Sequence, residues 1–296
     1  MKKTAQKITV IAVLAALAAA GGSVLARSWT DARLRRAVLT RAALAAGAVD
    51  LQAVRHLSGS EKDLSLAVYE RLKADLSDAR ASYPECRYIY LMGQSAGGRI
   101  FFYADSEPAG SSDESPPGQL YVEASAALLR AFKTGKPVVE GPIEDRWGVW
   151  VSAFVPLFSL DAEHAGRIVF GMDIDASDWR RLVVKNSLIL EVFVWAFFLS
   201  VAGIAALVVL RSEKSFSSSR RLRYALVLDV LALGCSLSLV AARIVCGRER
   251  DARRDFLAHV AEKIAASAQR QRPRMVHGNP LGGKRRVWGR VVLGGG

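Results

Sequence analysis

Three long apolar runs constrain this chain more than any other feature of its sequence. They cover residues 8–26, 187–210 and 224–246, and each is close to the ~20 residues that an α-helix needs to cross ~30 Å of hydrocarbon. Residues 27–186, between the first two runs, are polar and numerous enough for one packed core. The sequence therefore predicts one folded domain held between membrane-spanning helices.

The placement of charge supports a membrane protein and argues against nucleic-acid binding. The chain carries a net charge of +13, but residues 27–186 contain 20 basic and 21 acidic side chains. The basic excess flanks the apolar runs or lies after them, where Lys and Arg set the orientation of a span and interact with anionic lipid. We therefore expect the lipid bilayer as a partner, and no nucleic acid.

The order of the segments predicts a multi-pass topology with the domain outside the cytoplasm. Residues 1–26 form an N-terminal anchor, with a cleavable signal peptide as the alternative. The Arg- and Lys-rich segment after the second run belongs in the cytoplasm. The expected segments are the domain (27–186), a span (187–210), a cytoplasmic loop (211–223), a further span (224–246), a helical segment (247–270) and a disordered or truncated tail (271–296). The last span is also basic at its exit, so the alternative is a cytoplasmic tail with a hairpin that fails to cross.

Within the domain, periodicity predicts helices followed by an antiparallel sheet. Apolar residues recur every three or four positions over 34–53 and again over 64–76, the second stretch following a possible capping box at Ser60 and Asp63. Strands are expected at Arg87–Met92, Arg99–Asp105, Gly148–Leu157 and Arg167–Asp175, with a helix at Leu120–Lys133 and a further strand at Lys136–Glu140. This pattern gives an α+β fold in which an antiparallel sheet packs on helices.

Several runs in this region resemble those of one protein family. They are residues 88–93, 101–107, 115–118, Tyr121, 145–148, 150–152 and 171–179. Together they resemble the extracytoplasmic PAS/Cache-like region of bacterial membrane-bound sensor histidine kinases and diguanylate cyclases. The resemblance implies a PAS/Cache-like sheet with a long N-terminal helix, at the bacterial inner membrane. We also expect a homodimer.

The resemblance does not bring an enzymatic activity with it. The sequence has no GGDEF-type run and no glycine motif of a kinase ATP site. Gly93–Gly97 matches G-x-S-x-G, but a nucleophile elbow needs a helix after the serine, and a strand is expected there. We expect no catalytic residue, no metal and no cofactor in this chain.

A small-ligand pocket is the best candidate site. Alternation would place Tyr103 and Asp105 on one face of their strand, and Asp173 and Asp175 on one face of theirs. Aromatic walls with a few fixed charges suit a small ligand, although the same aromatic residues could simply be core. The predicted ligand-binding residues are Tyr103, Asp105, Tyr121, Arg146, Trp147, Trp150 and Asp173.

The leading hypothesis is a membrane-bound sensory receptor for a small ligand or for the state of the cell envelope. One alternative is a membrane-tethered binding module that does not signal. Another is a truncated sensor histidine kinase or diguanylate cyclase. A signalling role requires an element with two states that the ligand biases.

Overall fold

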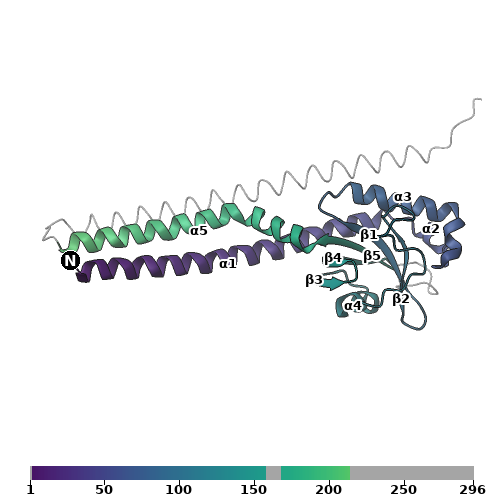
Figure 1. Ribbon diagram of the computed structural model, residues 1–296, viewed down its shortest axis with the longest axis horizontal. Coiled ribbons are helices and arrows are strands. Elements are labelled where there is room, and N and C mark those ends of the chain that lie inside the picture. The colour runs from purple at the N-terminus through teal and green to yellow at the C-terminus, as the bar shows by residue number, and fades with distance from the viewer. Residues whose placement is uncertain (1, 158–167, 214–296) are drawn as a thin grey trace, which may run out of the picture. The chain divides into compact units, whose positions relative to one another are not determined.

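The computed structural model describes residues 2–157 and 168–213 (Figure 1). The described residues belong to one compact unit. The predictions for the cytoplasmic loop beyond residue 213, the span at 224–246, the helical segment and the tail lie outside the described residues.

Two long helices frame the domain in the sequence. α1 (Lys2–Gly47) joins the first apolar run and the predicted amphipathic stretch into one continuous helix, and α5 (Ala176–Glu213) contains the second run. Among the described residues, both helices are long and apolar enough to cross a membrane. The predicted amphipathic helix does not reach Ala53 unbroken, because Asp50 starts a separate helix, α2 (Leu51–Arg55), and accepts hydrogen bonds from the first backbone N–H groups of that helix.

The sheet has five antiparallel strands in the order β2-β1-β5-β4-β3. Its strands are β1 (Tyr88–Gln94), β2 (Ile100–Asp105), β3 (Val138–Asp145), β4 (Gly148–Leu157) and β5 (Ile168–Asp175). All four clearly predicted strands are present, and the predicted fold class, an antiparallel sheet with helices and a long N-terminal helix, is confirmed. β3 extends five residues further than the expected strand because it pairs with β4 as far as the turn at residues 145–148.

Helices cover both faces of the sheet (Figure 1). On one face the last turns of α1 pack with α2 and with α3 (Ala67–Ala81), and a short 3-10 helix, η1 (Glu61–Ser65), precedes α3. The other face carries α4 (Ala126–Thr134), whose Leu128 and Phe132 pack on Met92 and Phe102. Burial of these two apolar layers on opposite faces of one sheet is the main stabilising contribution to the fold.

α4 begins later than the sequence suggested. The prediction started this helix at Leu120, but residues 120–125 are not helical and Ser125 is the N-cap, its Oγ accepting a hydrogen bond from Leu128 N at 3.0 Å. Tyr121 instead hydrogen-bonds to Ile100 O through its backbone N–H. This local override of helix propensity puts the Tyr121 side chain at the sheet rather than on a helix.

α1 and α5 lie side by side along the apolar runs. The Arg27 guanidinium donates two hydrogen bonds to the Glu191 carboxylate, at 2.9 and 2.8 Å, and Trp195 Nε1 donates to Ser23 Oγ at 3.0 Å. Gly22 allows close approach, since a Cβ at this position would lie 2.6 Å from a methyl carbon of Val194. The one acidic residue within the second apolar run is thereby neutralised by the first residue after the other run.

Candidate functional site

A pocket opens on the α4 side of the sheet, at the junction of β1, β5 and β4. It is a half-open cavity of about 30 Å³ within a concavity of about 370 Å³ that includes solvent at its mouth. The cavity has room for about two water molecules. The lining residues come from all five strands and from the segments between them: Tyr88, Tyr90, Met92, Phe102, Asp105, Asp113, Ser115, Tyr121, Asp145, Trp147, Trp150 and Asp173.

Six aromatic side chains, whose ring contacts fall into two groups, form most of the wall. Phe102 stands edge-on to three of them, with ring centroids 5.5 Å from Tyr90, 5.8 Å from Tyr121 and 5.9 Å from Trp147. Tyr121 and Trp147 stack at 6.2 Å, and Tyr88 stands edge-on to Trp150 at 5.1 Å. Such contacts hold each ring in one orientation and leave ring faces and edges available to a ligand.

Asp145 is held rigidly at the end of β3. Its Oδ1 accepts hydrogen bonds from Trp147 N at 2.9 Å, Gly148 N at 3.2 Å and Trp150 Nε1 at 2.9 Å. Its Oδ2 accepts one from the Tyr121 hydroxyl at 3.2 Å. The carboxylate therefore fixes both tryptophans and the tyrosine of the pocket wall, and its charge faces the cavity.

Asp173 on β5 is a buried carboxyl group of the pocket lining. Tyr90 Oη donates to its Oδ1 at 3.0 Å, and the Ser152 side chain also hydrogen-bonds to it. Burial raises the pKa of Asp173 to about 7, and the nearby charges of Asp145 and Glu140 add to the rise, which the two hydrogen bonds only partly oppose. Asp173 can thus gain or lose a proton near neutral pH.

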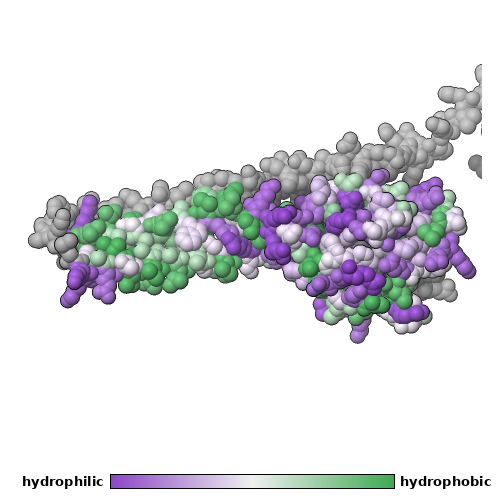
Figure 2. Space-filling model, in the orientation of Figure 1, coloured by the Kyte–Doolittle hydropathy of each residue, from purple (hydrophilic) through white to green (hydrophobic). Residues whose placement is uncertain are grey.

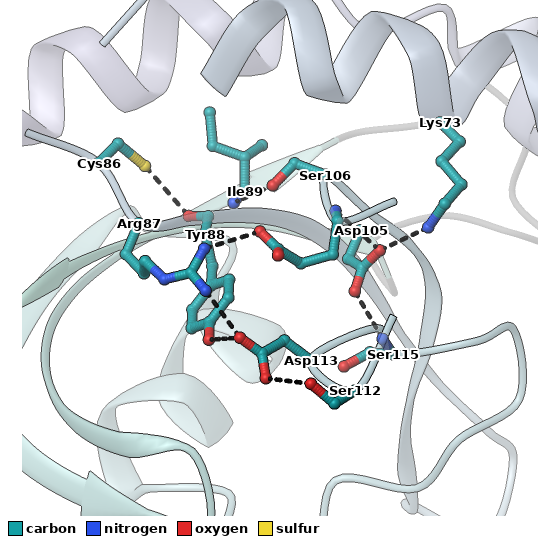
Figure 3. Close-up of polar contacts among 11 residues, drawn as sticks. Lys73, Cys86, Arg87, Tyr88, Ile89, Asp105, Ser106, Ser112, Asp113 and Ser115 are labelled. Atoms are coloured by element: carbon teal, nitrogen blue, oxygen red, sulfur yellow. Dashed lines mark hydrogen bonds and ion pairs between the residues drawn. The ribbon is translucent and has the colours of Figure 1, made fainter. Parts of the chain in front are cut away.

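The loop after β2 closes one side of the pocket through Asp113 and Ser115 (Figure 3). Arg87 holds this loop, donating to Glu107 at 3.0 Å and to Asp113 at 2.7 Å while its guanidinium lies 4.4 Å from the centre of the Tyr88 ring. Tyr88 Oη also donates to Asp113 at 3.2 Å. Arg87 therefore ties a loop wall of the pocket to the first residue of β1.

Lys73 of α3 holds the same loop from the opposite face of the sheet (Figure 3). Its ammonium group is almost fully buried and lies 2.7 Å from Asp105 Oδ1 and 2.8 Å from Glu114 Oε1. Asp105 in turn accepts hydrogen bonds from the backbone N–H groups of Glu107, at 3.2 Å, and Ser115, at 2.6 Å. One buried cation thus links α3 to the pocket lining.

The structure brings together five of the seven residues that the sequence predicted for the site. Asp105, Tyr121, Trp147, Trp150 and Asp173 all line the pocket. The sequence prediction missed seven lining residues: Tyr88, Tyr90, Met92, Phe102, Asp113, Ser115 and Asp145. Alternation along β1 could have identified the first three, because residues 88, 90 and 92 share a face of that strand.

Tyr103 lies on the other face of the sheet. The prediction that it shares a face with Asp105 is wrong, because the register between β1 and β2 shifts at Leu91 and Met92, which leaves Tyr103 as an extra residue between Phe102 and Ala104. Its ring stands edge-on to Phe101 at 5.0 Å and packs with the core under α3. The bulge reverses the alternation just before Asp105 and turns that carboxylate toward the pocket.

Arg146 lies in the β3–β4 turn, outside the pocket lining. Its guanidinium donates two hydrogen bonds of 2.8 Å to Glu123 and lies 4.9 Å from the centre of the Trp147 ring. The bonds from Arg146 lower the pKa of Glu123. The charge of Arg146 is therefore taken up by a neighbouring carboxylate at the surface.

The G-x-S-x-G run forms a hairpin. Gly93 and Gln94 end β1, Ser95 Oγ accepts a hydrogen bond from Arg99 N at 3.1 Å, and β2 follows at Ile100. A nucleophile elbow would require a helix at this point. The serine is held by the turn, as the sequence predicted.

Comparisons with known proteins add a likeness of fold. No family model matches the chain, and neither does any curated protein. Among solved structures, it is similar to the sensory domain of the Campylobacter jejuni chemoreceptor Tlp3 (CcmL), with 17% identity, a TM-score of 0.42 and coverage of 60% of this chain and 67% of that one. The chain is also similar to the ligand-binding domain of Campylobacter jejuni Tlp3 in complex with L-norvaline, with 14% identity, a TM-score of 0.40 and coverage of 60% of this chain and 64% of that one.

A second protein of this kind is the extracellular ligand binding receptor from Desulfohalobium retbaense. It is 15% identical, with a TM-score of 0.39 and coverage of 55% of this chain and 26% of that one. Matches at this level of identity and superposition carry no conclusion about what this chain binds.

Proposed function

We propose that this chain is a membrane-bound sensory receptor whose pocket binds a small ligand with a positively charged head group. One observation carries the choice of ligand. Among the residues that the structure describes, the pocket is lined by six aromatic residues and four aspartates, and by no Lys or Arg. A ligand anion would find no partner of opposite charge in this lining.

The aromatic wall suits a cation for electrostatic reasons. The face of an aromatic ring carries partial negative charge, so an ammonium or guanidinium group within about 6 Å of a ring centre is attracted, by up to ~2 kcal/mol when desolvated. The Tyr90 and Tyr121 hydroxyls stay protonated, because burial and the neighbouring carboxylates Asp173 and Asp145 raise the pKa of each phenol. These hydroxyls donate to the carboxylates and hold them in place beneath the ligand.

Two carboxylates remain for the ligand itself. Asp105 is paired with Lys73 and Asp113 with Arg87. Within the described part of the chain, Asp145 and Asp173 form no ion pair with a basic side chain, and the charge of Asp145 raises the pKa of Asp173. A bound cation would relieve this repulsion and replace the missing countercharge.

The size of the cavity limits which part of the ligand is buried. A half-open cavity of about 30 Å³ accepts a group as small as an ammonium or methylammonium head, and the rest of the ligand would lie in the wider concavity toward the mouth. The proposal therefore favours primary or methylated amines over bulky polycyclic cations.

A ligand screen on the full chain in detergent micelles tests the pocket. We expect some amines to raise the melting temperature and neutral or acidic analogues of the same size to have no effect. At a hundredfold excess over Kd, binding to the folded state alone adds about 2.7 kcal/mol, or roughly 5–10 °C for a domain of this size. Asp145→Asn and Trp147→Ala should weaken the response at least tenfold in ligand concentration.

Two variants separate this pocket from the one that the sequence suggested. Tyr103→Phe and Arg146→Gln alter residues outside the lining and should leave the response to the amine unchanged. A response lost in Arg146→Gln but kept in Asp145→Asn would contradict the proposal. If a broad amine panel gives no shift while acidic ligands do, the assignment of ligand charge is wrong.

Topology is tested separately with reporter fusions. We expect a fusion near Ser112 to be active only as an extracytoplasmic enzyme, and a fusion near Ser217 only as a cytoplasmic one, because the basic segment after α5 favours the cytoplasm. Activity of a cytoplasmic reporter fused near Ser112 would contradict the receptor model. Correct topology without any ligand would favour a membrane-tethered module that does not signal.

A further inference from the structure

The exposed surfaces of α1 and α5 change character just beyond the apolar runs. On α1, the exposed side chain of Leu25 is followed on the same side of the helix by Trp29, Arg33 and Arg36, at spacings of four, four and three; Trp29 and Arg36 are exposed and Arg33 is half-buried. On α5, the exposed Leu188 is preceded at spacings of three and four by Lys185 and Arg181, and the neighbouring Arg180 is exposed as well. Residues three and four apart share one face of a helix, so each apolar stripe continues directly into a basic one.

The position of this basic surface matches the headgroup layer of a bilayer. Lys7 and Arg27 bound the first apolar run, and the 19 residues between them span ~29 Å, close to the thickness of the hydrocarbon. Trp29 is half exposed two residues beyond that boundary, and Trp195 lies level with Ser23 just inside it. Exposed tryptophans at this depth are typical of the membrane–water interface.

The side chains of the α1 stripe lean toward the membrane. Cα–Cβ bonds in a helix tilt toward its N-terminus, and the N-terminus of α1 is the end inside the apolar run. Arg33 and Arg36 start ~9 and ~14 Å above Arg27 and extend back toward it. The Arg33 guanidinium lies 5.5 Å from the centre of the Trp29 ring, which places a cation against the interfacial aromatic residue.

Charge is also divided unevenly within the domain. Residues 27–36 and 178–185 contain seven basic and two acidic side chains, whereas the rest of residues 27–186 contains 13 basic and 19 acidic ones. Figure 2 shows hydrophilic surface beginning where the apolar surface of the two helices ends. The membrane-proximal end is therefore attracted to an anionic surface, and the remainder is repelled by it.

We propose that Arg33, Arg36, Arg180, Arg181 and Lys185 form a binding surface for the phosphate headgroups of anionic phospholipids, in the leaflet that faces the domain. This inference rests on the part of the proposed function that places α1 and α5 across a bilayer. Each basic residue near an anionic surface strengthens attraction by roughly fivefold, and the effect decays over about 10 Å. The surface keeps the membrane-proximal end of the domain against the headgroups, and the strength of this contact depends on the charge of the lipid.

Quenching of tryptophan fluorescence by brominated lipids tests the surface in the full chain reconstituted in vesicles. Trp29 and Trp195 report on the domain side of the spans, and Trp29→Phe gives the background of the other tryptophans. We expect brominated phosphatidylglycerol to quench at least threefold more effectively, per mole, than brominated phosphatidylcholine. The ratio of quenching by brominated phosphatidylglycerol to quenching by brominated phosphatidylcholine should fall toward one as the salt concentration rises from about 0.05 to 0.5 M, because the Debye length shrinks.

A matched pair of variants locates the effect. Replacing Arg33, Arg36, Arg180 and Lys185 by Gln should remove the preference for phosphatidylglycerol. The same change at four basic residues far from the membrane should preserve it: Arg99, Arg130, Lys133 and Lys136.

The outcomes separate this surface from the proposed function. Equal quenching by both lipids, or a preference unaffected by salt, would overturn the lipid surface while leaving the receptor intact. No quenching by either lipid would show that the tryptophans lie outside a bilayer and would remove the membrane topology itself.

Discussion

Replacing Lys73 by Met is expected to destabilise the domain by about 3–5 kcal/mol, because removal of one partner from a buried ion pair leaves uncompensated charge. Here the change leaves both Asp105 and Glu114 without their cation. The Asp105 side chain is only 5% exposed and the Glu114 side chain only 11%. Met keeps the length and apolar stem of lysine, so the loss reports on charge rather than on packing. Denaturant unfolding of the full chain in micelles, followed by tryptophan fluorescence, measures it.

The control replaces all three charges at once. Lys73→Met combined with Asp105→Asn and Glu114→Gln should recover a large part of the lost stability, because neutral groups have a smaller desolvation cost. Lys73→Met alone should also regain stability as pH falls and Asp105, whose pKa is raised by burial, becomes protonated. A loss below about 1 kcal/mol in Lys73→Met would mean that water reaches this cluster.

Asp173→Asn is expected to change how stability depends on pH. The pKa of Asp173 is raised to about 7 in the folded protein, mainly by burial, against 3.8 as its ordinary value. Between these values the folded state holds a proton that the unfolded state has released, so stability from this group is complete below pH ~4 and is lost as pH rises toward 7. Three pKa units correspond to about 4 kcal/mol.

The measurement compares the two proteins across pH. The free energy of unfolding of Asp173→Asn minus that of the parent should increase by about 4 kcal/mol between pH 4 and 8, because the parent loses stability as Asp173 ionises. Asp175, two residues on along β5, is the matched control. Hydrogen bonds from Ser177 lower its pKa, so Asp175→Asn should cost more at high pH than at low pH, which is the opposite trend. A pH-independent difference for Asp173→Asn would contradict the assignment.

The same proton couples to the proposed ligand. A cation beside Asp173 favours its ionised form, so binding near pH 7 should release a proton and weaken as pH falls. The amine response in the thermal screen should therefore decline between pH 8 and 6.

Alternation and turn signals were sufficient to predict four strands of the antiparallel sheet, although not the order of the strands. The strands ending at Asp105, Leu157 and Asp175 end at those residues in the structure, because each is a short β-rich run bounded by turn residues. The capping box at Ser60 and Asp63 is present as well. These features depend on neighbours in sequence, and for that reason one chain reveals them.

The parts of the site that escaped prediction depend on contacts between distant segments. The bulge that separates Tyr103 from Asp105 arises from the pairing of β2 with β1, and periodicity within one strand cannot reveal it. Asp113 reaches the pocket because Arg87, 26 residues earlier, binds it. Arg146 looked like a ligand contact because nothing in its own turn indicates that Glu123 neutralises it.

The continuity of α1 determines how far a small change in the domain can travel. Its last turns, with Ala42, Ala45 and Ala46, are buried in the core beneath the sheet, whereas its first turns lie in the apolar run. The helix is unbroken between these two ends, so a tilt of its last turns also moves its first turns. From Ala42 to the middle of the apolar run is about 25 residues, or ~38 Å. A tilt of about 5° in the core would swing that point by roughly 3 Å, a displacement that needs no backbone hydrogen bond to break.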